Sequence, residues 1–156
     1  MPGFDDHFWM KEALVEAEKA EQKDEIPVGA VIVLNDECIA RGHDLRETSG
    51  DPTNHAEMIA LRKAAKKIGG WRLCDCEMYV TLEPCPMCAG ALILSRVKRL
   101  VYGAPNLKFG AVGSQCNILS LSGFNHKVEV TPGIMAKECG AILTRFFKNK
   151  RNEIQG

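Results

Sequence analysis

MYVTLEPCPMCAGALILSRVKRLVYG, residues 78–103, is the stretch that decides the fold of this chain. Residues 78–82 are apolar and rich in β-forming side chains, which predicts a buried strand. Residues 86–95 predict a short helix, because they begin with a proline, which suits the first helical position. Residues 99–102 predict a second strand, which ends at Gly103. A strand, a helix and a strand in succession are typical of an α/β domain.

The flanking sequence continues this alternation of strands and helices. The predicted elements are a helix at 6–22 capped by Asp5 or Asp6, a hairpin of strands 30–34 and 37–41 around Asn35-Asp36, a polar loop at 42–54, a helix at 55–67 ended by Gly69-Gly70, a helical turn within 116–121, a strand at 127–131 and a final helix that carries Ile134 to Phe147. We therefore expect an α/β fold with helices on both faces of one sheet. In such sheets, ligands bind beyond the carboxyl ends of the strands.

Composition limits the class of protein. The chain has 156 residues, without an internal repeat or a linker, so we expect one domain over 1–156. No apolar run approaches the roughly 20 residues of a membrane span, and no secretory signal is visible at the start, which predicts a cytoplasmic protein. Lysine plus arginine equals aspartate plus glutamate, at 20 each, so net charge neither indicates nor excludes nucleic acid. Basic clusters lie at 62–67, 96–99 and 145–151, and solvated helix ends explain them equally well.

Three residues form a candidate metal site. The chain has seven cysteines, and closely spaced cysteines in a cytoplasmic protein more often bind metal or act in catalysis than form disulfides. Cys85 and Cys88 lie at i and i+3 on the predicted helix, and His55 lies at another helix start. Imidazole and thiolate suit zinc, and three protein ligands leave a fourth tetrahedral position open, as in catalytic zinc sites. We expect one zinc ion held by these residues.

Glu57 is the candidate acid–base group beside this metal. A carboxylate next to a zinc-activated water takes its proton and passes it to the substrate. Two alternatives stay open at this point. Glu57 fits a capping box with Asn54, and the zinc would be structural if a fourth ligand such as Cys74 or Cys76 joined the site. In the second case the domain would be a nucleic-acid-binding or dimerisation module without activity.

The pairing of His55-Ala-Glu57 with Pro84-Cys85-Pro-Met-Cys88 is the zinc deaminase signature. Over nearly its whole length the chain resembles the bacterial tRNA-specific adenosine deaminases, within the cytidine deaminase-like superfamily. The blocks that carry the resemblance are Ile26-Pro-Val-Gly-Ala-Val31, Asp51-Pro-Thr-Asn-His-Ala-Glu57, Tyr79-Val-Thr-Leu-Glu-Pro-Cys-Pro-Met-Cys-Ala-Gly-Ala-Leu92, Gly110-Ala-Val-Gly-Ser114, Asn125-His126 and Phe146-Phe147.

This resemblance implies a fold, an activity and a partner. It implies a three-layer α/β/α domain with a mixed five-stranded sheet, in a homodimer that carries one Zn²⁺ per subunit. The substrate would be a tRNA anticodon stem-loop, whose wobble adenosine is splayed into a pocket and converted to inosine. Zinc-activated hydroxide would attack C6 of the base, and Glu57 would protonate the ring nitrogen and later the leaving amine.

The resemblance also implies which residues contact the substrate. They are Val28, Asp44, Ala56, Leu82, Glu83, Asn106 and Phe147. Two of them depart from the family pattern, since the family usually has Asn in place of Asp44 and Asp in place of Asn106, near the ribose. An ionised Asp only accepts hydrogen bonds, which suits a base that presents donors. The alternative function is therefore deamination of a free purine base or nucleoside such as guanine.

Overall fold

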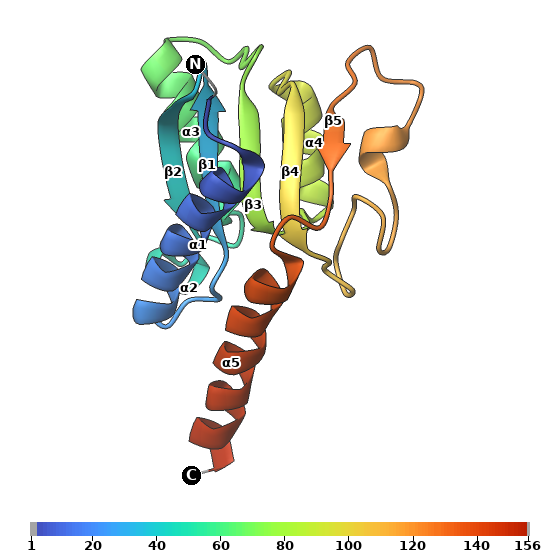
Figure 1. Cartoon of the computed structure of the whole chain (residues 1–156). Coiled ribbons are helices and arrows are strands. Elements are labelled where there is room, and N and C mark those ends of the chain that lie inside the picture. The colour runs from blue at the N-terminus through green and yellow to red at the C-terminus, as the bar shows by residue number, and fades with distance from the viewer. Residues whose placement is uncertain (1–2, 156) are drawn as a thin grey trace.

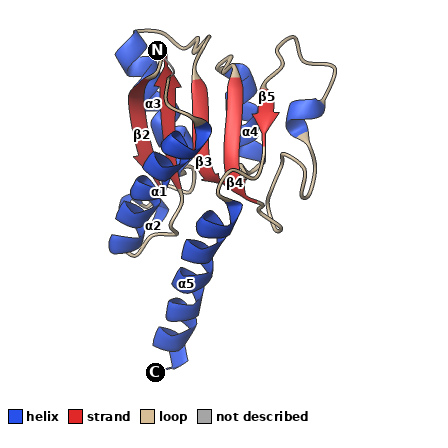
Figure 2. Ribbon diagram, in the orientation of Figure 1, coloured by secondary structure: helices blue, strands red, loops and turns tan. Residues whose placement is uncertain are grey.

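The computed structural model describes residues 3–155. The elements in chain order are α1 (Asp6–Gln22), β1 (Gly29–Leu34), β2 (Glu37–His43), α2 (Arg46–Ser49), α3 (Ala56–Ile68), β3 (Glu77–Leu82), α4 (Pro86–Leu94), β4 (Arg99–Ala104), the 3-10 turn η1 (Ile118–Ser120), β5 (Glu129–Thr131) and α5 (Ala136–Gln155). Figures 1 and 2 show one sheet with helices in front of it and behind it. Within residues 3–155, no helix combines the length and the apolar character that a membrane crossing requires.

The five strands form one mixed sheet in the order β2-β1-β3-β4-β5. β1 is antiparallel to both β2 and β3, whereas β3, β4 and β5 run parallel to one another. The parallel strands therefore all end at the same edge of the sheet, and the chain leaves β3 at that edge to enter α4. This arrangement confirms the expected mixed five-stranded α/β fold.

Alternation along β1 explains the three layers. Ala30 and Ile32 face the core cluster that includes residues of α3 and α4. Val31 and Val33 face the other cluster, which includes residues of α1 and Cys139 of α5. Both sides of this strand are buried, as is typical of a sheet covered on its two faces. In Figure 1, α1 lies in front of the sheet, α3 and α4 lie behind it, and α5 extends away beyond its lower edge.

Two local features hold β2 and α3 in place. Asn35 and Asp36 both have positive φ, 51° and 60°, which is the backbone of the tight turn that a two-residue hairpin favours. A Cβ atom added at Gly42 would lie 2.6 Å from the carbonyl oxygen of Ala56, so only glycine allows α3 to approach β2 this closely. The start of α3 is thereby fixed against the sheet.

Two expectations differ from the structure: the final helix begins at Ala136, so Ile134 lies before it, and residues 42–54 are not all loop. The predicted polar loop at 42–54 contains the end of β2 and the short helix α2. The cause is a long-range contact: the buried carboxylate of Glu25 accepts hydrogen bonds from the backbone N–H groups of Glu47 and Thr48, at 3.1 and 2.6 Å. A carboxylate at a helix start stabilises its unpaired N–H groups, and local sequence patterns do not show such a contact.

Candidate active site

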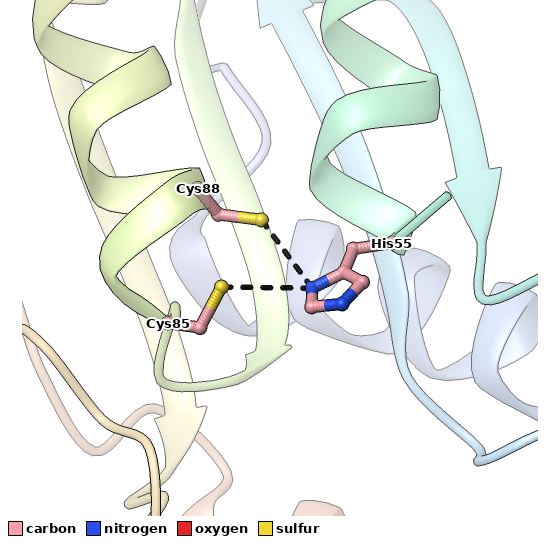
Figure 3. Close-up of side chains that lie close together, drawn as sticks. All are labelled: His55, Cys85 and Cys88. Atoms are coloured by element: carbon pink, nitrogen blue, oxygen red, sulfur yellow. Dashed lines mark hydrogen bonds between the residues drawn. The ribbon is translucent and has the colours of Figure 1, made fainter. Parts of the chain in front are cut away.

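The three predicted metal ligands lie at the starts of two helices. His55 is the N-cap residue of α3 and Cys85 is the N-cap residue of α4, while Cys88 lies in the first turn of α4. Neither N-cap side chain bonds the backbone of its own helix, which leaves both free to point toward each other. Figure 3 shows that both sulfur atoms face the same nitrogen of the His55 ring.

The distances fit a tetrahedral zinc ion. His55 Nδ1 lies 3.6 Å from Cys85 Sγ and 3.6 Å from Cys88 Sγ, and the three ligand atoms all lie within 4.8 Å of one another. With bonds of about 2.0 Å to nitrogen and about 2.3 Å to sulfur, a tetrahedral angle separates the two ligand atoms by about 3.5 Å, close to the distances found. The His55, Cys85 and Cys88 group can therefore hold a metal ion without rearrangement.

The electrostatics of the two thiols differ. A hydrogen bond from Cys88, with a further contribution from His55, lowers the pKa of Cys85 to about 4 despite its partial burial. The same Cys85–Cys88 contact, together with burial, raises the pKa of Cys88 far above its usual range. Contact with Cys85 also raises the pKa of His55. These contacts thus favour the thiolate form of Cys85, and thiolate is the form that binds metal.

Glu57 is buried beside this group. Its residue is 4% exposed, and burial raises the pKa of its carboxyl to about 7, although His55 works in the opposite direction. The capping box with Asn54 is wrong, because α3 begins one residue later than that motif requires and His55 takes the N-cap position. Asn54 instead bonds Ser49 and Arg62. No ion pair found between residues 3 and 155 involves Glu57.

Several predicted substrate contacts gather at the same edge of the sheet. The register of β1 with β3 pairs Ala30 with Val80, so Val28 and Leu82 lie opposite each other where these strands meet the site. Asp44 donates its backbone N–H to Val28, at 3.2 Å. Ala56 is fully buried at the start of α3. These residues surround the end of the sheet from which α4 and its cysteines begin.

Asp44 is not a free hydrogen-bond acceptor. Its side chain is buried, and both of its oxygens accept hydrogen bonds from the guanidinium of Arg46, with Nε distances of 3.2 and 3.1 Å and an Nη2–Oδ2 distance of 3.1 Å. Oδ1 also accepts from the Arg46 backbone N–H, at 3.0 Å. In this structure Asp44 therefore presents no free acceptor to a base, and its contact with the substrate stays a prediction. Arg46 was missed because nothing in its sequence surroundings marks it as the partner of Asp44.

Glu83 organises the loop that follows β4. Its buried carboxylate accepts hydrogen bonds from the backbone N–H groups of Asn106, Val112 and Ser114, at 3.1, 2.9 and 3.0 Å, and from the Ser114 hydroxyl at 2.5 Å. Burial works to raise the pKa of Glu83, but these hydrogen bonds outweigh it and lower the pKa. Asn106 uses its side-chain oxygen to accept from Phe109 N–H at 3.1 Å. Glu83 thus fixes the loop from Asn106 to Ser114 next to the start of α4.

Phe147 lies on α5, and its side chain is 43% exposed. Its neighbour Phe146 packs edge-on against it, with ring centroids 5.4 Å apart. Phe146, Lys150, Lys23 and Arg46 help to line a pocket of about 460 Å³ between the end of α1, α2 and α5. Because Arg46 also contacts Asp44, this pocket adjoins the group of predicted substrate contacts.

A known protein family matches this chain over nearly its whole length. The family model of MafB19-like deaminases matches residues 4–151. This match covers nearly the whole chain, including the sheet, the two helix starts that carry the metal group, and most of α5. The chain is therefore a deaminase, which agrees with a His/Cys/Cys metal group beside a buried carboxylate.

Curated relatives narrow the class to one family. The chain is 51% identical over 148 residues to the tRNA-specific adenosine deaminase of Bacillus subtilis strain 168, covering 95% of this chain and 92% of the relative. It is 49% identical over 149 residues to the enzyme of the same name from Haemophilus influenzae, covering 95% and 86%. The chain belongs to the family of tRNA-specific adenosine deaminases.

Solved structures agree with this assignment. A structure from work on A-to-I editing by tRNA:A34 deaminases at the wobble position of transfer RNA superposes with a TM-score of 0.84 and 42% identity, covering 87% of this chain and 99% of that one. Guanine deaminase from Bacillus subtilis superposes with a TM-score of 0.63 and 41% identity, covering 65% and 66%. The likeness to the guanine deaminase is thus both looser and less complete.

Proposed function

We propose that this chain converts adenosine to inosine at the wobble position of a tRNA anticodon by hydrolytic deamination. The observation that carries the proposal is a buried carboxyl, Glu57, beside three convergent ligand atoms of His55, Cys85 and Cys88. The curated relatives are named for this activity, and the similarity to them extends over most of their length. Because tRNA is a cytoplasmic substrate and the seven cysteines are free thiols, the proposed location is the cytoplasm.

The proposed cofactor is one zinc ion per subunit, held by His55, Cys85 and Cys88. The donor set of one imidazole and two thiolates and the nitrogen–sulfur separation of 3.6 Å support zinc. When bound, zinc lowers the pKa of water and so supplies a nucleophile at neutral pH. The protein's own part is to hold the three ligand atoms at the starts of two helices, where contacts with Cys88 and His55 lower the pKa of Cys85.

Glu57 is the proposed proton carrier. Its burial raises its pKa to about 7, so the carboxyl both accepts and donates protons near neutral pH. In hydrolytic deamination, water adds to the carbon that bears the amino group and ammonia leaves. Glu57 would accept the first proton of the attacking water and deliver it to the adjacent ring nitrogen. It would then accept the second proton, from the hydroxyl group now on that carbon, and pass it to the amine, which leaves as ammonia while the carbonyl forms. A carboxyl at the start of α3 is held rigidly enough for this transfer.

Aromatic and basic side chains on α5 support an RNA substrate. Exposed Phe147 offers a face on which an unpaired base can stack. Lys150 and Arg46 line the adjoining pocket but are paired with Asp24, Glu153 and Asp44, so the positive charge that phosphates need comes from exposed cations of α5 such as Lys148 and Arg151. Asn106, fixed by Glu83, and the site edge formed by Val28, Ala56 and Leu82 would surround the target nucleotide.

A homodimer is the proposed assembly. α4 carries no charged residue, and its outer side leaves apolar surface in contact with solvent. Leu94 is 70% exposed and Pro86 is also exposed. An uncharged apolar helix face on a protein surface is typical of a subunit contact, and light scattering of the zinc-loaded protein tests this assembly.

The test of the activity is the Glu57→Gln variant. A tRNA anticodon stem-loop is incubated with zinc-loaded protein, and inosine is measured by mass spectrometry. We expect turnover to fall by about 10²–10⁴-fold, the usual contribution of a positioned acid–base group. The zinc content and the Tm of the variant should stay the same as in the unmodified protein. Glu18→Gln, which changes an exposed carboxyl of α1, is the matched control.

The same experiment contains the outcome that contradicts the proposal. If unmodified, zinc-loaded protein leaves the stem-loop unchanged, the proposed substrate is wrong. Release of ammonia from guanine in a parallel sample would then favour the free-base alternative. We do not favour that alternative, because Arg46 occupies the Asp44 acceptors on which it depends.

A further inference from the structure

A second pocket lies at the opposite edge of the sheet from the metal group. It has a volume of about 350 Å³ and is formed where β3, β4 and β5 begin. Because these strands are parallel, their starts share one edge and their ends share the other. β3 spans six residues, which at roughly 3.3 Å per residue separates the two edges by about 17 Å. The pocket is therefore distinct from the proposed catalytic site.

Four cationic side chains line this pocket: Arg72, Arg96, Lys98 and Lys127. Two carboxylates, Asp75 and Glu129, also line it, so positive charge is in excess. Across residues 3–155, no ion pair involves any of these six side chains. This contrasts with the neighbouring Arg99, which pairs with both Asp6 and Glu77. Unpaired cations around a concave surface attract an anion.

The two arginines of the pocket are held in place before any ligand binds. The guanidinium of Arg72 lies 4.4 Å from the centre of the Trp71 ring, and that of Arg96 lies 5.5 Å from it. Arg96 also donates hydrogen bonds to the carbonyl oxygens of Ile93 and Leu94, at 3.1 Å each, where α4 ends. Cation–π contacts and these hydrogen bonds restrict both side chains, which lowers the entropic cost of binding.

We propose that this pocket is a second binding site, separate from the catalytic one, and that it takes phosphate groups. Guanidinium and ammonium groups are the side chains that bind phosphate, arginine by its planar fork and lysine as a point charge. The phosphate belongs either to an RNA chain or to a small phosphate ion, since the same cations recognise both. The inference does not depend on the proposed reaction.

Tryptophan fluorescence provides the test. The chain has two tryptophans: Trp9 is 5% exposed, whereas Trp71, whose ring contacts two arginines of the pocket, is 52% exposed. Quenching by a bound ligand therefore reports on Trp71. The probes are an oligomer of uridylate, which has no amino group to be removed, and inorganic phosphate. We expect saturable quenching by the oligomer at low salt, and no such quenching in a Trp71→Phe variant.

Charge-reversal variants distinguish binding of the oligomer in this pocket from its non-specific electrostatic attraction to the protein surface. The double variant Lys98→Glu, Lys127→Glu should weaken oligomer binding at least ten-fold. It should also reduce the slope of log affinity against log salt by about 1.4, since each phosphate contact on a single strand contributes about 0.7. The matched control, Lys11→Glu with Lys63→Glu, makes the same charge change at exposed positions outside the pocket.

Each outcome bears on the proposal. Quenching by the oligomer, with or without quenching by inorganic phosphate, supports an RNA phosphate site, and quenching by inorganic phosphate alone supports a site for a small phosphate ion. If neither probe quenches Trp71, or if the two double variants weaken binding equally, the pocket is not a phosphate site. Inosine formation on the stem-loop is measured separately, so failure of this proposal is distinguishable from failure of the proposed activity.

Discussion

Glu83→Gln tests whether one buried carboxylate fixes the loop beside the metal group. The carboxylate accepts four hydrogen bonds, two at each oxygen. In the best orientation the glutamine oxygen accepts from Val112 and Ser114 N–H, and its amide faces Asn106 N–H and the Ser114 hydroxyl. The hydroxyl can rotate and accept, so the N–H of Asn106 alone loses its acceptor.

The magnitude follows from this count. One unsatisfied donor costs about 1–3 kcal/mol, and each of two remaining bonds loses about 1 kcal/mol because its acceptor is no longer charged. Asn106 is partly exposed, so water compensates part of the loss. We expect a decrease of about 3 kcal/mol in the free energy of unfolding. For a chain of this size that lowers Tm by roughly 6–12 °C.

Circular dichroism during heating measures the loss of stability, and hydrogen exchange measures the loosening of the loop. Exchange at Val112 and Ser114 should accelerate in the variant more than exchange in the central strands. Glu12→Gln is the control, because Glu12 forms a half-exposed ion pair with Arg41, and such pairs contribute about 0–1 kcal/mol. A Glu83→Gln protein that melts within 2 °C of the control would refute the reasoning that this carboxylate holds the loop.

Three further predictions concern the metal group, the Asp44 pair and acid stability. Cys88→Ser should lose bound zinc on dialysis, measured by elemental analysis, whereas Cys74→Ser, at an exposed cysteine, should retain it. Arg46→Ala leaves the buried Asp44 carboxylate without its cation and should cost about 1–3 kcal/mol in urea unfolding, discounted because Arg46 is 35% exposed; adding Asp44→Asn should recover most of it. Burial works to raise the pKa of Glu25, but hydrogen bonds from α2 hold it below its usual 4.5. Because the unfolded chain then binds more protons than the folded one, the free energy of unfolding should fall as pH drops below 4.5. Urea unfolding of the unmodified protein and of Glu25→Gln at pH 4 and pH 7 tests this, and the decrease should be smaller in the variant.

The sequence predicted the elements well because their signals are local. Helix α1 begins and ends at the predicted residues, since Asp5 caps its first turn with a hydrogen bond to Phe8 N–H at 2.8 Å. The hairpin follows from Asn35-Asp36, a dipeptide that tolerates positive φ at both positions. The metal group was predictable for the same reason, because Cys85 and Cys88 share one helical turn and His55 lies at another helix start.

What the sequence did not show depends on contacts between distant residues. Glu83 and Ser114 are 31 residues apart, and only the folded chain brings the carboxylate to the loop. Glu25 stabilises the start of α2 by accepting a hydrogen bond from Glu47 N–H, 22 residues further along the chain. Nothing in the local sequence around either glutamate distinguishes it from a glutamate on the surface. A buried carboxylate can be identified only once its hydrogen-bond partners are known.

The choice of base rests on the pair of Asp44 and Arg46 taken as a unit. Alone, a carboxylate at the site edge accepts hydrogen bonds and favours a base that presents donors. Paired, its negative charge is balanced and its acceptors are engaged by the guanidinium of Arg46. A ring nitrogen of adenine needs a donor. The Asp44–Arg46 pair therefore gives no physical reason to prefer guanine over adenine as the base.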